Sequence, residues 1–154
     1  MRILSGVVVL ALGLSIAVTS TAAGGGGAAA QGRMTEADYD ALMKKVGPTN
    51  GGMRKQIMGN MLPEAAKSAQ ALATLFGDVE RFWTQHKVKD AMMWAGDARK
   101  FATETAGAAA AGDQMKAQMA ADNLLGQCKQ CHGTYRMGSQ EAGFSIKPGV
   151  LGAE

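Results

Sequence analysis

The chain has 154 residues, with 16 Lys and Arg against 13 Asp and Glu and a formal net charge of +3. The length fits one domain, and the charge is too small and too scattered for a nucleic-acid footprint, which needs clustered Lys and Arg. Aromatic residues make up 5% of the chain and long β-branched runs are missing, which disfavours an all-β domain. With two His and two Cys, the chain alone cannot supply a His-rich di-metal site or a zinc site of four cysteines.

The N-terminal residues have the pattern of a secretory signal peptide. Arg2 is basic, Val7–Val18 is apolar, and small residues suited to cleavage follow by residue 23, with a second candidate by residue 30. The alternative is a transmembrane anchor, but the apolar run is shorter than the roughly 20 residues that span a membrane. Export predicts a periplasmic protein in an oxidising compartment, with no stable membrane insertion after cleavage. Residues 24–34, rich in Gly and Ala, are predicted to be a flexible linker.

Residues 35–136 carry apolar residues at helical spacing, which predicts one helical domain. Four segments share this pattern, and they cover residues 35–61, 62–86, 88–111 and 114–136. Thr35 and Asp38 predict a capping box at the first segment, and Asp113 predicts an N-cap for the last. Gly47-Pro48 predicts a kink or break in the first helix. Residues 137–154 have no helical period and are predicted to be an irregular C-terminal tail.

Four helices with short connections predict an all-α fold, an antiparallel four-helix bundle. The third segment has a stripe of small residues, which lets helices approach closely; these residues are Ala91, Ala95, Ala98 and Ala102. Where Ala replaces Leu, something else must often fill the core volume, and a large apolar cofactor would do so.

Cys128-Lys129-Gln130-Cys131-His132 is a C-x-x-C-H run, the attachment pattern for c-type haem. Two thiols three residues apart on one helical face can reach the two vinyl groups along one edge of a porphyrin. The imidazole of His132 can then bind the iron axially. We therefore predict one covalent haem c near the last helix, held by Cys128 and Cys131, with His132 as the proximal iron ligand.

Two other chemistries use paired cysteines. An exported C-x-x-C can be a redox disulfide, but the thioredoxin type expects a strand before the motif, and here a helix is predicted. A zinc site would need ligands beyond the motif, and only His86, expected at the surface, remains as a nitrogen donor.

The position of the motif on the last predicted helix resembles the class II c-type cytochromes, the cytochrome c prime family. That family has C-K-x-C-H-x-x-Y/F-R there, and the matching residues are Cys128, Lys129, Cys131, His132, Tyr135 and Arg136. The likeness covers about residues 35–136. It implies a haem in the bundle core, His132 as proximal ligand, Arg136 beside a haem propionate, and a possible homodimer.

In the same family, one position on the first helix faces the iron. A Met there gives a six-coordinate, low-spin haem, whereas another apolar residue leaves a site open to gases such as NO or CO. Residues 40–47 resemble the low-spin branch, which places Met43 at the axial position, with Tyr39 where that branch has Arg. A thioether ligand raises the reduction potential. The alternatives are Met53, Met58 or an open site, with Met43 as core filling.

These features predict a non-enzymatic haem protein that carries single electrons between redox partner proteins. The alternative is a five-coordinate, gas-binding or NO-buffering protein. A weak peroxidase is disfavoured, because no distal His or Arg is placed to assist O–O cleavage. Trp83 and Trp94 are expected in the core or against the haem rather than as electron relays.

Overall fold

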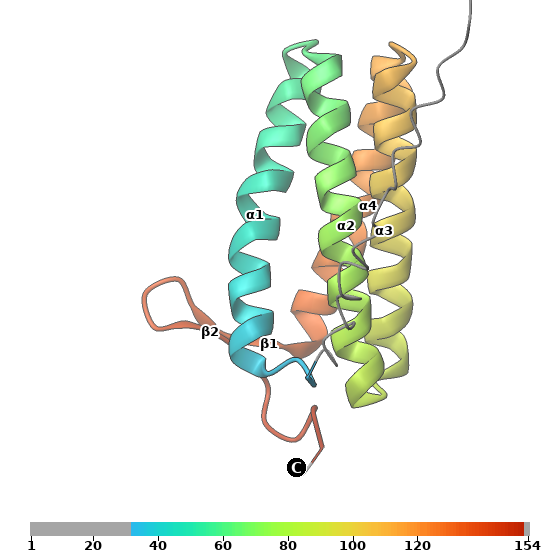
Figure 1. The fold of residues 1–154 in the computed structure, drawn as a ribbon. Helices are drawn as coiled ribbons and strands as arrows, with labels where there is room; N and C mark the ends of the chain where they lie inside the picture. The colour runs from blue at the N-terminus through green and yellow to red at the C-terminus, as the bar shows by residue number, and fades with distance from the viewer. Residues whose placement is uncertain (1–31, 153–154) are drawn as a thin grey trace, which may run out of the picture. The chain divides into compact units, whose positions relative to one another are not determined.

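The computed structural model describes residues 32–152 and consists of four α-helices followed by a β-hairpin (Figure 1). The helices are α1 (Glu36–Met58), α2 (Leu62–His86), α3 (Lys89–Ala110) and α4 (Gln114–Tyr135). They agree closely with the four predicted segments. The predicted signal peptide and most of the predicted linker lie outside the described residues. Within residues 32–152, every helix is too short or too polar to cross a membrane.

Local capping signals set the starts of α1 and α4. Thr35 Oγ1 accepts a hydrogen bond from Asp38 N, and the Asp38 carboxylate accepts one from Thr35 N at 2.9 Å, which confirms the predicted capping box. The Thr35 hydroxyl, at 2.7 Å, and the Thr35 backbone N–H both donate to the Asp38 carboxylate and stabilise its ionised form, so the pKa of Asp38 lies below its usual value. Asp113 caps α4 in the same way, accepting from Lys116 N at 3.0 Å, as predicted.

Of the kink or break predicted at Gly47-Pro48, the break is wrong, because α1 continues through Pro48 as one bowed helix (Figure 1). A proline in a helix interior costs about 3 kcal/mol. Burying one large apolar side chain contributes about 1.5–3 kcal/mol, so several such residues outweigh that cost. The buried residues lie on both sides of Pro48: Tyr39, Leu42, Val46, Met53 and Ile57. Tertiary packing therefore keeps the helix continuous.

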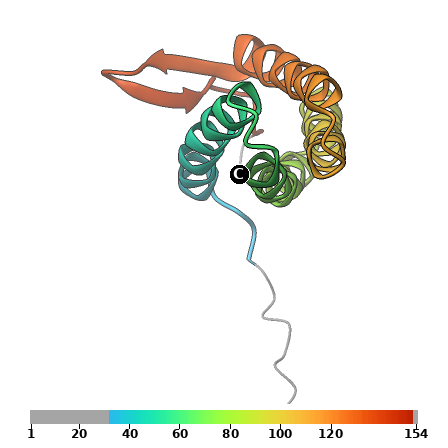
Figure 2. The same ribbon diagram turned by 90° about the horizontal axis from the view of Figure 1, so that it is seen from above.

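The helices pack in chain order, α1 on α2, α2 on α3 and α3 on α4, whereas the first and last helices, α1 and α4, touch each other much less than these neighbouring pairs do (Figure 2). Toward one end, α1 and α4 are joined by an ion pair between Arg54 and Asp122 at 2.7 Å. There, Gln114 Nε2 also donates to Ile57 O at 2.6 Å. The α3 side of the core is built mainly from small residues, the buried Ala91, Ala95, Ala98, Ala102, Ala106 and Ala109. The seam between α1 and α4 is thus the least closed part of the core.

Part of the C-terminal tail, predicted to be irregular, forms a β-hairpin. β1 (Arg136–Ser139) follows α4 directly and pairs antiparallel with β2 (Gly143–Ile146). Gly138 and Gly143 have φ of +94° and +82°, and a Cβ at Gly138 would lie 2.2 Å from the carbonyl oxygen of Gly143. Only glycine fits there. The all-α prediction therefore holds for residues 36–135 and misses this hairpin.

The tail after β2 is tied to the end of the helical core. Lys147 N donates to Tyr135 O at 2.8 Å, and Lys147 Nζ donates to Thr134 O at 2.7 Å, which satisfies carbonyls at the end of α4. Ile146 N donates to Glu36 Oε1 at 3.1 Å on the first turn of α1. These bonds explain why a short, glycine-rich segment is ordered.

Candidate functional site

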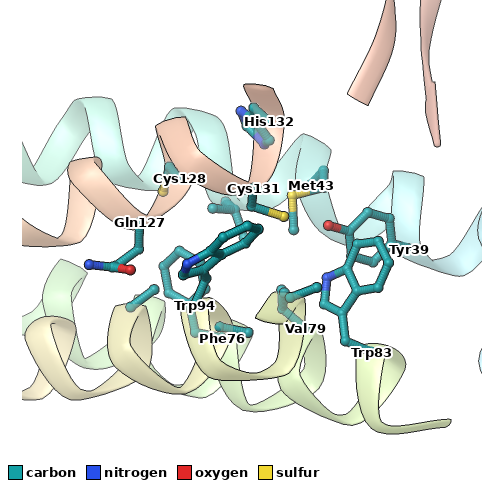
Figure 3. Close-up of a pocket in the computed structure, with 14 residues that line it drawn as sticks. Tyr39, Met43, Phe76, Val79, Trp83, Trp94, Gln127, Cys128, Cys131 and His132 are labelled. Atoms are coloured by element: carbon teal, nitrogen blue, oxygen red, sulfur yellow. The ribbon is translucent and has the colours of Figure 1, made fainter. Parts of the chain in front are cut away.

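All four helices contribute to one small apolar cavity (Figure 3). Its volume is about 40 Å³. Its lining residues are Tyr39, Met43 and Val46 of α1, Phe76, Val79 and Trp83 of α2, Ala91, Trp94, Ala95 and Ala98 of α3, and Gln127, Cys128, Cys131 and His132 of α4. The structure therefore brings four of the five predicted site residues to one cavity; they are Met43, Cys128, Cys131 and His132.

Cys128 and Cys131 are half-buried, unpaired thiols on the inner side of α4. Figure 3 shows the sulfur of Cys131 directed toward the side of the cavity where Met43 and Tyr39 lie. Burial raises the pKa of each thiol to about 11. Reactive cysteines of disulfide exchange need the thiolate, which a lowered pKa supplies. The environment of this pair therefore disfavours the redox-disulfide alternative.

His132 lies at the edge of the cavity, on the opposite side of the cysteines from Trp94 and Phe76 (Figure 3). Burial, and then the positive charge of Arg136, lower the pKa of His132. The imidazole is therefore neutral near pH 7. That is the form whose lone pair binds a metal.

Met43 is partly buried on α1 and lines the cavity together with Tyr39 and Cys131 (Figure 3). The two alternative methionines are placed differently. Met53 is fully buried but does not line the cavity, and Met58 is 67% exposed. Met43 alone of the three lies on the cavity wall.

Arg136, the residue predicted beside a propionate, does not line the cavity. It is the first residue of β1, it is exposed, and its guanidinium lies over the Phe144 ring, 4.2 Å from the centroid. The Arg136 guanidinium therefore packs on the hairpin in a cation–π contact.

Tyr39 is a cavity residue that the sequence predictions left without a role. It is 9% exposed, and its ring stacks on Phe82 at 4.3 Å and meets Trp83 edge-on at 5.3 Å. Burial, followed by the nearby Cys131, raises the pKa of Tyr39, so its hydroxyl stays protonated. The available signal was the spacing, since Tyr39 precedes Met43 by one helical turn and shares its face.

The chemistry of these residues fits a covalent haem. Two thiols three residues apart face an apolar cavity, a neutral imidazole follows, and a thioether lies on another helix. The cavity, about 40 Å³, is close to the roughly 30 Å³ that one water occupies in the liquid, so the helices around it would have to move apart to admit a porphyrin. Within residues 32–152, no three His, Cys, Asp or Glu side chains converge to hold a metal ion directly.

Comparisons with known proteins identify no family for this chain. A scan against protein-family models found no match, and searches of curated proteins and of solved structures found none either. The likeness to class II cytochromes therefore rests on the C-x-x-C-H run and on the residues around Met43.

Proposed function

We propose that the protein is a class II c-type cytochrome, an antiparallel four-helix bundle that carries single electrons between periplasmic redox partners. The convergence of Cys128, Cys131, His132 and Met43 on one apolar cavity carries the proposal. The short connections between successive helices support the antiparallel arrangement. The signal-like N-terminus supports export.

Four residues would hold haem c, each through a different bond. Cys128 and Cys131 would form the thioether bonds, His132 would be the proximal iron ligand, and Met43 would be the distal one. When bound, the haem supplies a one-electron iron couple. A thioether ligand favours the ferrous state and raises the potential. The apolar walls around Phe76 and Trp94 restrict water, which also tunes the potential.

Covalent attachment tests the haem part of the proposal. The full chain is produced with a haem-attachment system, and its mass is measured after acid-acetone extraction. We expect the mass of one haem to remain on the wild type and to be absent from a Cys128→Ala/Cys131→Ala variant. A wild type that stays haem-free, alongside a known cytochrome that is loaded in the same cells, would refute the proposal.

Gas binding is the second candidate, and the Tyr39 hydroxyl favours it, because this buried donor lies in the same cavity as Met43. A small ligand that displaced Met43 could accept a hydrogen bond there. Carbon monoxide added to the ferrous protein separates the two functions. For electron transfer, the wild type and the exposed control Met58→Ala do not react, and Met43→Ala does. For gas binding, all three react.

A further inference from the structure

Tyr135 and Asp90 form a hydrogen-bonded pair where α4 ends beside the start of α3. The Tyr135 hydroxyl donates to Asp90 Oδ1 at 2.5 Å. The same oxygen accepts from Ala91 N at 3.0 Å, which fixes the carboxylate in the first turn of α3. The positive end of the helix dipole stabilises negative charge at that position. A phenol is therefore held against an anchored base.

The hydrogen bond defines the protonation state of the pair. It raises the pKa of Tyr135 to about 12, because deprotonation would place two negative charges side by side. The phenol stays neutral near pH 7 and keeps the proton that it shares with Asp90. The distance of 2.5 Å is that of a short hydrogen bond from a hydroxyl to an ionised carboxylate.

Tyr135 also lies against two indole rings. Its ring centroid is 5.5 Å from that of Trp83 and 6.0 Å from that of Trp94. Both tryptophans line the cavity that holds Met43 and Cys131. Since orbital overlap falls steeply with distance, rings in contact exchange electrons readily. Aromatic contacts therefore connect the cavity to a half-buried phenol at the end of the core.

We propose that Tyr135 is a redox-active residue that gives up one electron to a strong one-electron oxidant and its hydroxyl proton to Asp90. The O–H bond breaks, the electron goes to the oxidant, the proton goes to Asp90 Oδ1, and a neutral phenoxyl radical remains on Tyr135. One-electron reduction returns the electron, and the proton moves back.

The other tyrosine, Tyr39, can be compared with Tyr135, because the chain contains two Tyr and two Trp. The hydroxyl of Tyr39 is buried and interacts with Cys131 and Trp83, neither of which is a base that accepts a phenol proton readily. Oxidation of Tyr39 would leave a cation in an apolar site, which is costly. Tyr135 avoids that charge by passing its proton to Asp90.

Photo-oxidation of the full-length protein tests the proposal. A ruthenium(III) tris-bipyridine complex, generated by a laser flash with a sacrificial electron acceptor, oxidises the protein, and electron paramagnetic resonance identifies the radical. Iron, where present, is kept ferric. We expect a neutral tyrosyl radical in the wild type and in the control Tyr39→Phe. We expect that signal to be lost in Tyr135→Phe and in Asp90→Asn, with a tryptophan radical in its place.

Other results would overturn the proposal. They are a tyrosyl signal that disappears in Tyr39→Phe but persists in Tyr135→Phe, or a full yield in Asp90→Asn. The wild type provides a check that needs no substitution, since breaking the O–H bond makes tyrosyl formation slower in D₂O. Equal rates in H₂O and D₂O would contradict proton transfer to Asp90. Neither readout depends on a haem, so failure here is distinct from failure of the proposed function.

Discussion

Phe82 of α2 packs among several aromatic rings in the core. Its side chain is fully buried. It stacks on Tyr39 with ring centroids 4.3 Å apart, meets Trp83 at 5.1 Å and lies 4.6 Å from the His86 ring. We predict that Phe82→Ala is among the most destabilising single substitutions in residues 32–152.

The size of the effect follows from these contacts. Truncation of a buried Phe to Ala typically costs about 3–5 kcal/mol, which includes the cavity left behind. The aromatic pairs, worth ~0.5–1.5 kcal/mol each, are part of that measured total and place Phe82→Ala at its upper end, about 4–5 kcal/mol. Phe82→Leu keeps most of the volume but loses the ring pairs, and we expect about 1–2 kcal/mol. The larger loss approaches the whole stability of a small domain, about 5–15 kcal/mol.

Urea unfolding followed by far-UV circular dichroism measures both variants. The midpoint should fall strongly for Phe82→Ala and modestly for Phe82→Leu, with little change in slope. A loss below about 1 kcal/mol for Phe82→Ala would show that the aromatic contacts among Tyr39, Phe82 and Trp83 do not form as described.

Three further predictions concern α1, the seam and the thiols. Pro48→Ala restores a backbone donor in the middle of α1 and should stabilise the protein by about 1–3 kcal/mol in urea unfolding; a loss would mean that α1 is broken there. The bond with Arg54 holds the pKa of Asp122 below its usual value, so the contribution of the pair is present above about pH 4 and is lost as the pH falls through the lowered pKa. Asp122→Asn should therefore cost at most about 1 kcal/mol at pH 7 and nothing in strong acid; an equal cost at both pH values would contradict this. Because burial raises the pKa of both thiols to about 11, iodoacetamide at pH 8 should alkylate Cys128 and Cys131 of the folded haem-free chain far more slowly than in urea, as measured by mass; equal rates would place the thiols at the surface.

The helices were predictable because their signals are local. The Thr35–Asp38 capping box, the Asp113 cap and the helical apolar spacing each lie within a few residues of the boundary that they determine. The approach of α1 to the C-x-x-C-H run depends on packing between distant segments. The resemblance to class II cytochromes nevertheless led to Met43, which lies on the cavity wall; its role as an iron ligand stays a prediction.

The features that were missed depend on non-local contacts. The continuity of α1 through Pro48 comes from core packing on both sides of the proline. The hairpin has no alternation of apolar and polar residues, and its strands are almost entirely exposed. Its order depends on Lys147 and Glu36, which lie far apart in the chain. Arg136 could not be placed from sequence because the strand that positions it was not predicted.

The most direct test is the visible spectrum of the full-length protein produced with a haem-attachment system, recorded oxidised, reduced, and reduced with carbon monoxide. A haem held by Cys128, Cys131, His132 and Met43 predicts sharp, split bands in the reduced form that carbon monoxide does not move. A broad high-spin reduced spectrum that shifts with carbon monoxide would contradict ligation by Met43. A spectrum without haem bands would contradict the haem site altogether.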